Sequence, residues 1–206
     1  MKKLLIAVLA VLCVAPAAMA KDWGAAVKLG AGENDPKTLK NEYDSMPFSK
    51  ELDKSAGYLS FEVLHEWALN EEANKLGLKI GWETYGINKV DNKTIGGNIE
   101  EHSDAFPFTV YYRRDNGVGK FSWFAGAGVT IMHSKLESEG AYWGKHNTSK
   151  NRVFPHIAAG AEYRFTEVFA LGLDARYNIS AKVKKDGMTL SDRSGFGAAL
   201  AARFYF

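Results

Sequence analysis

The chain has 206 residues, with 26 Lys and Arg against 24 Asp and Glu, a formal net charge of +2 and a mean hydropathy of −0.23. These values exclude a disordered tail, a collagen-like repeat and a membrane protein built of many helices, because each of these needs a far more biased composition. The charge balance also argues against a polybasic nucleic-acid-binding protein, so we expect no nucleic acid as a partner.

Residues 1–20 have the parts of a secretory signal peptide: two lysines, an apolar run from Leu4 to Val14, and the small-x-small sequence Ala18-Met19-Ala20. The apolar run is too short to cross the ~30 Å of bilayer hydrocarbon. The single cysteine, Cys13, lies inside it, and the remaining chain has 24 basic and 24 acidic residues. We therefore expect a cleaved signal peptide followed by one neutral, cysteine-free domain over residues 21–206.

Beyond residue 20, apolar residues recur with a period of two rather than at helical spacing. In the stretch from Leu76 to Glu83, for example, apolar residues alternate with glycine or charged residues, which is typical of a strand with one apolar face. Eight such strands are predicted, at about 23–32, 56–67, 75–87, 104–114, 120–134, 152–165, 168–182 and 194–206.

The connections between these strands alternate in length. Four are long and polar, at 33–55, 88–103, 135–151 and 183–193. Three are short turns, around Asn70-Glu71-Glu72, Asp115-Asn116-Gly117 and Thr166-Glu167. This alternation predicts an all-β fold, an eight-stranded antiparallel up-and-down barrel with both ends of the domain on the short-turn side.

The apolar face of such a barrel can point inward around a ligand, as in a soluble lipocalin, or outward to lipid, as in a bacterial outer-membrane barrel. The residues out of phase with the apolar set include five acids and six bases, a near balance that favours a closed polar interior over a solvated outer face, although the latter remains an alternative. The predicted interior charge network consists of Lys28, Glu62, Glu66, Lys79, Glu83, Arg113, Glu162, Arg164, Asp174, Arg176 and Arg203.

Aromatic residues of the apolar set gather at the short-turn ends of the strands, whereas the strand centres carry Val, Leu, Ile and Ala. Rings collected at one level beside an aliphatic band are typical of a bilayer interface. The predicted interface girdle consists of Trp23, Trp67, Tyr112, Phe121, Trp123, Tyr163, Phe165, Phe169, Phe204 and Phe206. A looser ring at the opposite rim would contain Phe106, Tyr177 and Phe196.

Four motifs carry a resemblance to a known family: the glycine-spaced strand Phe124 to Val129, the hairpin His156 to Glu167, the strand Leu173 to Tyr177 and the ending Ala202 to Phe206. They resemble the porin-like outer-membrane β-barrel family, the small barrels related to the membrane domain of outer membrane protein A and to the Ail and Opa proteins. The resemblance implies a transmembrane barrel of a Gram-negative outer membrane, with short periplasmic turns and four long extracellular loops. It also implies an assembly signal at Phe204 and Phe206, recognised by the barrel assembly machinery.

The family is functionally mixed, so the resemblance identifies no activity. We expect a structural or surface-interaction protein that contacts an extracellular or host ligand through its loops, with an interior plugged by the charge network rather than an open channel. Candidate loop contacts are Tyr142, Trp143, Lys184 and Lys185. The fourth loop, with Lys182 and Arg193 in addition, forms a basic rim that would meet lipopolysaccharide phosphates.

Two alternatives remain open. A lipid-modifying enzyme would need a nucleophile beside a base, but His133 and Ser134 are adjacent in a strand and so face opposite sides. A barrel that binds or passes a small hydrophobic ligand would need a lateral gap, and Pro107 and Pro155 each predict either such a gap or a bulge. We expect no catalytic residues, metal or cofactor.

Overall fold

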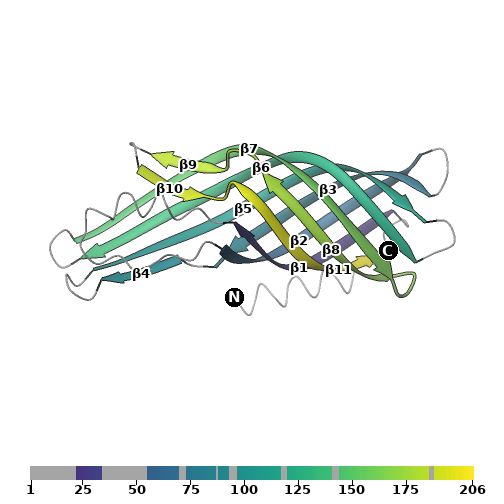
Figure 1. Ribbon diagram of the computed structural model, residues 1–206, viewed down its shortest axis with the longest axis horizontal. Coiled ribbons are helices and arrows are strands. Elements are labelled where there is room, and N and C mark those ends of the chain that lie inside the picture. Colours follow the sequence, from purple (N-terminus) through teal and green to yellow (C-terminus); the bar gives the residue numbers. More distant parts are fainter. Residues whose placement is uncertain are drawn as a thin grey trace.

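The segments with alternating apolar and polar residues form long antiparallel strands (Figure 1). The structure is a computed structural model that describes residues 22–33, 55–69, 73–86, 88–92, 97–116, 120–140, 144–185 and 188–206. The predicted signal peptide, residues 1–20, and residues 34–54 of the predicted first loop lie outside these ranges. No helix in the described ranges has the length and apolarity to span a membrane. The strands are β1 Trp23–Glu33, β2 Ser55–Ala68, β3 Asn74–Tyr85, β4 Asn88–Asn92, β5 Gly97–Asp115, β6 Phe121–Gly140, β7 Gly144–Arg164, β8 Phe169–Asn178, β9 Lys182–Lys185, β10 Met188–Asp192 and β11 Gly195–Tyr205.

The barrel wall consists of the eight long strands β1, β2, β3, β5, β6, β7, β8 and β11. Each pairs with the long strands before and after it in the chain, and β1 pairs with β11. The order of the sheet is β3-β2-β1-β11-β8-β7-β6-β5-β4, and β3 also pairs with β5, which closes the ring. All of these pairings are antiparallel. The predicted eight-stranded up-and-down barrel is therefore confirmed, and its closure leaves no open sheet edge along the barrel wall.

The two ends of the barrel differ. The C-terminus lies at one end, whereas β4, β9 and β10 lie at the opposite end (Figure 1). At the C-terminal end, the amide of Phe206 donates to the carbonyl of Trp23 at 3.0 Å, which ties the last strand to the first. The turn after β7 is tight because the Thr166 hydroxyl accepts a hydrogen bond from the amide of Phe169 at 3.0 Å.

Three of the predicted long connections are corrected by the structure. Residues 88–103 contain β4 and the start of β5, residues 135–151 form the outer part of the β6–β7 hairpin, and residues 183–193 contain most of the β9–β10 hairpin. The pairing of β6 with β7 continues without interruption from Phe121↔Tyr163 to Gly140↔Gly144. Most residues of these extensions are polar, and their few apolar positions, such as Leu136, Val183 and Leu190, do not form the sustained alternation by which strands were predicted.

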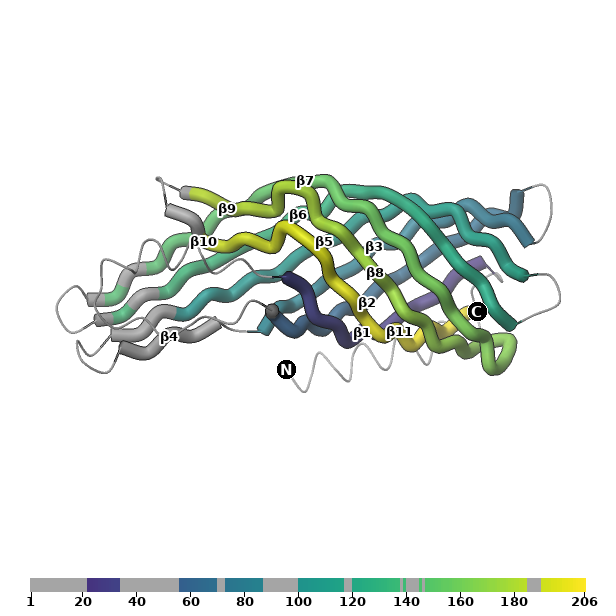
Figure 2. The backbone as a smooth tube through the Cα atoms, in the orientation of Figure 1, coloured from purple at the N-terminus to yellow at the C-terminus, as the bar shows by residue number. Residues whose placement is uncertain are grey.

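The β9–β10 hairpin folds into the barrel mouth at this end. Strand β8 ends at Asn178, earlier than predicted, and Ser180 has a φ of 55°, a backbone conformation that is uncommon for residues other than glycine. Figure 2 shows the resulting step in the backbone between β8 and β9. Ala181, Val183 and Leu190 of this segment form one buried apolar cluster with Ala56, Tyr85, Ala105, Met132, Leu136 and Phe154 of the barrel wall.

Of the two outcomes predicted for the prolines, a bulge occurs at neither, whereas a gap in the ladder occurs at Pro107. The register of β5 with β6 is constant across Pro107, and that of β6 with β7 is constant across Pro155. On its other side, β5 pairs with β3 at Phe108 and again at Ala105, so Pro107 coincides with a local gap in the ladder, because proline has no amide to donate. The two strands stay close at this gap: a Cβ built on Gly81 would lie 3.1 Å from Pro107 Cγ.

Two inward-facing glycines make room for tyrosine rings of a neighbouring strand. A Cβ on Gly77 would collide with the ring of Tyr111, and a Cβ on Gly30 with the ring of Tyr58. Gly172 similarly faces the guanidinium of Arg203. Large polar and aromatic side chains thus fill the interior and pack directly against these glycine residues.

Candidate functional site

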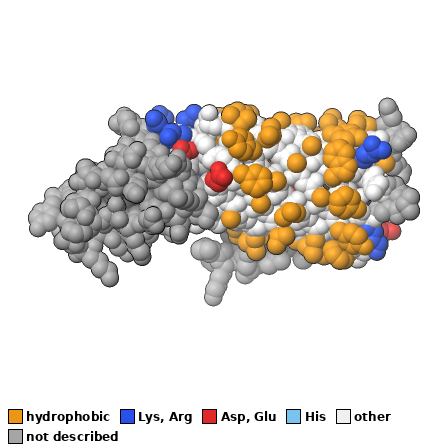
Figure 3. Space-filling view, viewed as in Figure 1, with side chains coloured by type: hydrophobic (Ala, Val, Ile, Leu, Met, Phe, Trp, Pro, Cys, Tyr) orange, Lys and Arg blue, Asp and Glu red, His pale blue; other side chains and the backbone are white. Residues whose placement is uncertain are grey.

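The outer wall of the barrel carries an apolar band. Hydrophobic side chains cover the middle of the face shown in Figure 3, and Lys and Arg side chains lie near its two ends. Leu200 is 70% exposed, and it pairs with the exposed Leu29 and Leu173 on either side. Such a surface is unstable in water and suits lipid.

The predicted girdle residues lie on this wall at the C-terminal end. Tyr163 contacts Phe165, Phe165 contacts Phe169, and Phe169 contacts Phe204, with ring centroids 5.0, 6.1 and 5.3 Å apart. Tyr112 and Trp123 form another contact at 5.8 Å.

Trp23 and Trp67 lie on either side of His65, with centroid distances of 4.5 and 4.4 Å. Phe121 is exposed, and Phe206 is half-buried beside Trp23. Together with the preceding contacts, these rings occupy one level of the wall, as amphipathic rings do at a membrane interface.

The height of the apolar band fits a bilayer. Outward positions of β6 are apolar from Phe121 to Ile131, and the next outward residue is His133. These ten residue steps, at about 3.3 Å each and tilted by about 40°, span about 25 Å, the height expected for an outer-membrane barrel. His133 pairs with Asp104 and Asn151, so a polar row begins at this level on three strands.

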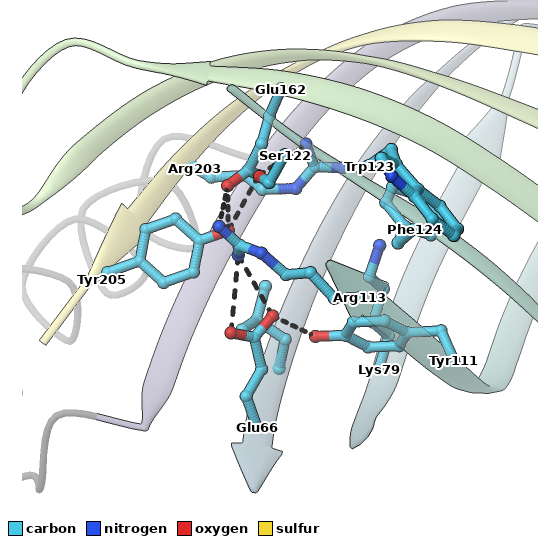
Figure 4. Close-up of a pocket in the computed structure, with 11 residues that line it drawn as sticks. Glu66, Lys79, Tyr111, Arg113, Ser122, Trp123, Phe124, Glu162, Arg203 and Tyr205 are labelled. Atoms are coloured by element: carbon cyan, nitrogen blue, oxygen red, sulfur yellow. Dashed lines mark hydrogen bonds and ion pairs between the residues drawn. The ribbon is translucent and has the colours of Figure 1, made fainter. Parts of the chain in front are cut away.

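Inside the barrel, Arg113 is the centre of an ion-pair cluster near the C-terminal end (Figure 4). Its Nη2 lies 2.6 Å from Glu162 Oε1, and its Nη1 lies 3.2 Å from Glu66 Oε1 and donates to the hydroxyl of Tyr205 at 2.6 Å. Tyr111 donates to Glu66 at 2.8 Å. Each charge is therefore met by an opposite charge and by a tyrosine hydroxyl, which accepts from Arg113 and donates to the carboxylates, and this offsets the cost of burying it.

Arg203 continues the network toward the middle of the barrel. Its guanidinium, 1% exposed, bridges Glu162, at 3.2 Å, and Asp174. Lys28 Nζ lies 2.6 Å from Asp174 Oδ2 and 2.5 Å from Glu62 Oε1. Side chains of β1, β2, β7, β8 and β11 are thus linked to one another.

A third cluster lies nearer the mouth. The guanidinium of Arg176 contacts both oxygens of Glu83 at 2.6 Å, and Tyr85 donates to Glu83 at 3.0 Å. The Nζ of Lys79 instead lies 3.2 Å from the centre of the Phe124 ring and forms no ion pair among the described residues. This geometry is a cation–π contact.

All eleven residues of the predicted charge network lie on the inward side of the wall. Arg164, only half-buried, is the most loosely placed, 3.8 Å from Glu162 and over the ring of Tyr205. Cavities of about 10 and 30 Å³ lie between these side chains.

Residues 4–204 match the family described as the outer membrane protein beta-barrel domain. The chain belongs to this family. Its members are barrels of the bacterial outer membrane, which agrees with the apolar band and the closed eight-stranded topology. No curated protein sequence matches the chain.

Solved outer-membrane barrels share the fold. A major outer membrane protein of Thermus thermophilus is 11% identical, with a TM-score of 0.54, 89% of this chain covered and 99% of that chain. Neisserial surface protein A is 14% identical, with a TM-score of 0.52 and coverage of 91% and 98%. Ail, the attachment invasion locus protein of Yersinia pestis, is 11% identical, with a TM-score of 0.50 and coverage of 90% and 99%. At these identities the likeness shows the fold alone.

The predicted loop contacts of this outer-membrane barrel are only partly within the described ranges. Tyr142 and Trp143 lie outside them, as does the side chain of Lys185. Lys184 is exposed on β9. The prediction that Arg193 belongs to a basic rim is wrong: it is 2% exposed and lies 3.1 Å from Glu101.

Two histidines of the barrel have clear environments. His133 faces outward and contacts Asn151 Oδ1 at 2.5 Å, whereas Ser134 is buried inside, so the two do not form a catalytic pair. His156, inside, lies between the hydroxyls of Thr109 and Thr130 at 2.9 and 2.8 Å. In the described ranges, no group of three or more His, Cys, Asp and Glu is placed to hold a metal ion.

Above the apolar band, charge pairs on the outer face of the β5–β6–β7 extension are solvated. Lys135 pairs with Glu137, and its hydrogen bond lowers the pKa of the Glu137 carboxyl. His102 lies 3.6 Å from Glu100. Such exposed pairs contribute little to stability.

The inward tyrosines were missed by the sequence analysis. Tyr85, Tyr111 and Tyr205 donate to carboxylates of the network. Each stands two residues from a predicted network residue, Glu83, Arg113 or Arg203, and therefore on the same face of its strand. That spacing is the signal that would have identified them.

Proposed function

We propose that this outer-membrane barrel does not conduct solutes and acts at the cell surface, as a structural or surface-interaction protein that recognises its partner through the hairpins at the mouth. The observation that carries the proposal is the filled interior: the cavities between the ion-pair clusters measure about 10 and 30 Å³, and the β9–β10 hairpin packs into the mouth. A barrel without a passage leaves its exposed hairpins as the place for recognition.

In this proposal the C-terminal end with its short turns faces the periplasm, and β4, the β6–β7 tip and the β9–β10 hairpin face the outside. Short periplasmic turns and longer extracellular connections are the rule for such barrels. Export would depend on residues 1–20 as a cleaved signal peptide.

The purified full-length protein should show no steady conductance in a planar lipid bilayer, because layers of paired charges cross its interior. Single-channel recording checks this, with an unrelated porin as the positive control. A reproducible open state on the nanosiemens scale would overturn the proposal of a closed barrel.

Lipopolysaccharide phosphate is the proposed contact of the basic residues at the mouth. Lys150 and Lys184 are exposed there, and Lys182 lies 3.3 Å from Asp192. Tyr142 and Trp143 remain candidates for a protein or glycan partner.

Replacing Lys184 by Glu should weaken binding to vesicles that contain lipopolysaccharide by about fivefold or more, because a basic residue near an anionic surface contributes about 1 kcal/mol. Co-sedimentation at low and high salt measures this effect. The matched control is Lys120→Glu, an exposed lysine at the opposite end. Equal losses for the two variants would contradict the proposed contact.

The proposal includes no catalysis and no transport of a hydrophobic ligand. Ser134 has the hydroxyl of Ser103 as its partner at 3.1 Å, and among the described residues no histidine forms a hydrogen bond with it. At the ladder gap beside Pro107 the two strands stay close, since a Cβ built on Gly81 would lie 3.1 Å from Pro107 Cγ. Mass spectrometry of lipid A from cells with and without the protein should therefore give identical spectra.

A further inference from the structure

The outer face of the β5–β6–β7 extension carries two histidines just above the apolar band. His133 follows Ile131, the last outward apolar residue of β6, by two residues, which places it about 5 Å above the hydrocarbon. The headgroup region of a bilayer extends about 5–7 Å beyond the hydrocarbon on each side. The imidazole of His133 therefore lies at the level of lipid phosphates. His102 lies one row further out, opposite Lys135.

Groups from three strands face His133. On β5, Asp104 is its register partner, and on β7, Asn151 Oδ1 lies 2.5 Å from its Nδ1. An amide oxygen only accepts hydrogen bonds, so Nδ1 carries a hydrogen and Nε2 is the atom that takes up a proton in acid. On β6 itself, Lys135 is the next residue on the same face. The neutral imidazole thus lies between one carboxylate and one ammonium group.

The surroundings of His102 are more acidic. Its Nε2 lies 3.6 Å from Glu100 Oε2, and Asp104 is the next residue of β5 on the same face. On β6, Lys135 is its register partner, and Glu137 is the register partner of Glu100. The hydrogen bond from Lys135 lowers the pKa of the Glu137 carboxyl, so this group stays ionised in mild acid.

The net charge of this face depends on the two histidines. On the other side of β5, the register partners are Thr84 for Asp104 and Lys89 for Glu100. Among the outward side chains that the structure describes on β5, β6 and β7, four are carboxylates and two are lysines: Glu100, Asp104, Glu137, Glu139, Lys135 and Lys145. These three strands therefore carry a net charge of −2 with neutral imidazoles and none once both imidazoles are protonated.

We propose that this face is an acid-dependent contact with lipopolysaccharide phosphate, made through His133 and His102. It rests on the proposed function, because this end of the barrel has to face the outside. At neutral pH the net negative charge repels the phosphates. At a pH below about 6.5, the ordinary pKa of histidine, each imidazolium removes one unit of that charge and donates a charge-assisted hydrogen bond to a phosphate oxygen.

The full-length protein in micelles of a zwitterionic detergent, titrated with lipopolysaccharide, tests this contact. EDTA is present, so that no divalent cation bridges carboxylates to phosphates. The apparent affinity, followed by the magnetic resonance shifts of the Ser149 and Asn151 amides, should be about tenfold or more higher at pH 5.5 than at pH 7.5. The reason is that each positive charge near an anionic surface contributes about fivefold.

Two histidine variants make the result specific. The double variant His102→Gln, His133→Gln should lose most of the rise in affinity, whereas His65→Gln, on the outer wall at the opposite end, should keep it. Lipid phosphates titrate in the same range, so the comparison between variants at one pH decides. If the double variant does not fold, each single variant should lose part of the rise.

Three outcomes overturn the proposal. The first is an equal rise in the unmodified protein and in the histidine variants, and the second is no rise at all. The third is tight binding at pH 7.5 that requires added magnesium and ignores both histidines, which would assign the face to carboxylate–metal–phosphate bridges. Lys184→Glu separates this contact from the proposed function: it should lower the affinity at both pH values and leave the rise intact, and no effect of Lys184→Glu at either pH contradicts the proposed function alone.

Discussion

Replacing Arg203 by Met is expected to lower the free energy of unfolding by about 3–5 kcal/mol. Arg203 is 1% exposed and faces both Glu162 and Asp174, so its removal leaves two carboxylates with an unbalanced negative charge in the barrel. Urea titration of the protein in phospholipid vesicles, followed by tryptophan fluorescence, measures the change.

Two further variants make this result specific. Adding Asp174→Asn to Arg203→Met removes one of the two carboxylates that Arg203 contacts, and should restore part of the lost free energy of unfolding. Arg114→Met changes an exposed arginine of the same end and should stay within about 0.5 kcal/mol of the unmodified protein. If Arg203→Met costs no more than Arg114→Met, the interior network does not stabilise the barrel.

The second large effect is expected on the lipid face. Leu200→Arg should destabilise the inserted barrel by about 2–4 kcal/mol, because Leu200 is 70% exposed near the middle of the apolar band. The same titration in vesicles provides the measurement, together with the fraction of protein that inserts.

Ser149→Arg is the matched comparison for Leu200→Arg. Ser149 is exposed on β7 above the polar row that begins at His133 and Asn151, so the added charge should cost only about 0–1 kcal/mol. Similar losses at Leu200 and Ser149 would contradict the placement of the bilayer around the barrel.

The barrel could be predicted because one face of each strand meets lipid and the other meets the interior. In the stretch from Leu76 to Glu83, apolar residues alternate with glycine or charged residues, and this stretch lies in β3 as expected. The strand residues within 135–151 are polar or glycine on both faces except Leu136, so they show no alternation and their strands could not be recognised. Cross-strand pairing, which extends β6 and β7 there, depends on partners distant in sequence.

The charged residues of the interior could be predicted from the sequence, but the contacts between them could not. Strand parity placed Glu162, Arg113 and Arg203 inside, yet which of them meet depends on the stagger of neighbouring strands. Arg193 stands in a polar segment that was predicted as a loop, but that segment turns inward after Ser180 and buries Arg193 against Glu101.

The pairing of the first strand with the last has a consequence for biogenesis. Nine register pairs join β1 to β11, from Gly24↔Tyr205 to Gly32↔Gly197, across nearly the whole sequence. Until β11 is present, β1 would expose its backbone amides and carbonyls to hydrocarbon, which costs several kcal/mol for each unpaired group. Insertion strand by strand would therefore leave the free edge of β1 unpaired, and we expect the barrel to close only once β11 is present. Its folding is dominated by distant contacts and is correspondingly slow.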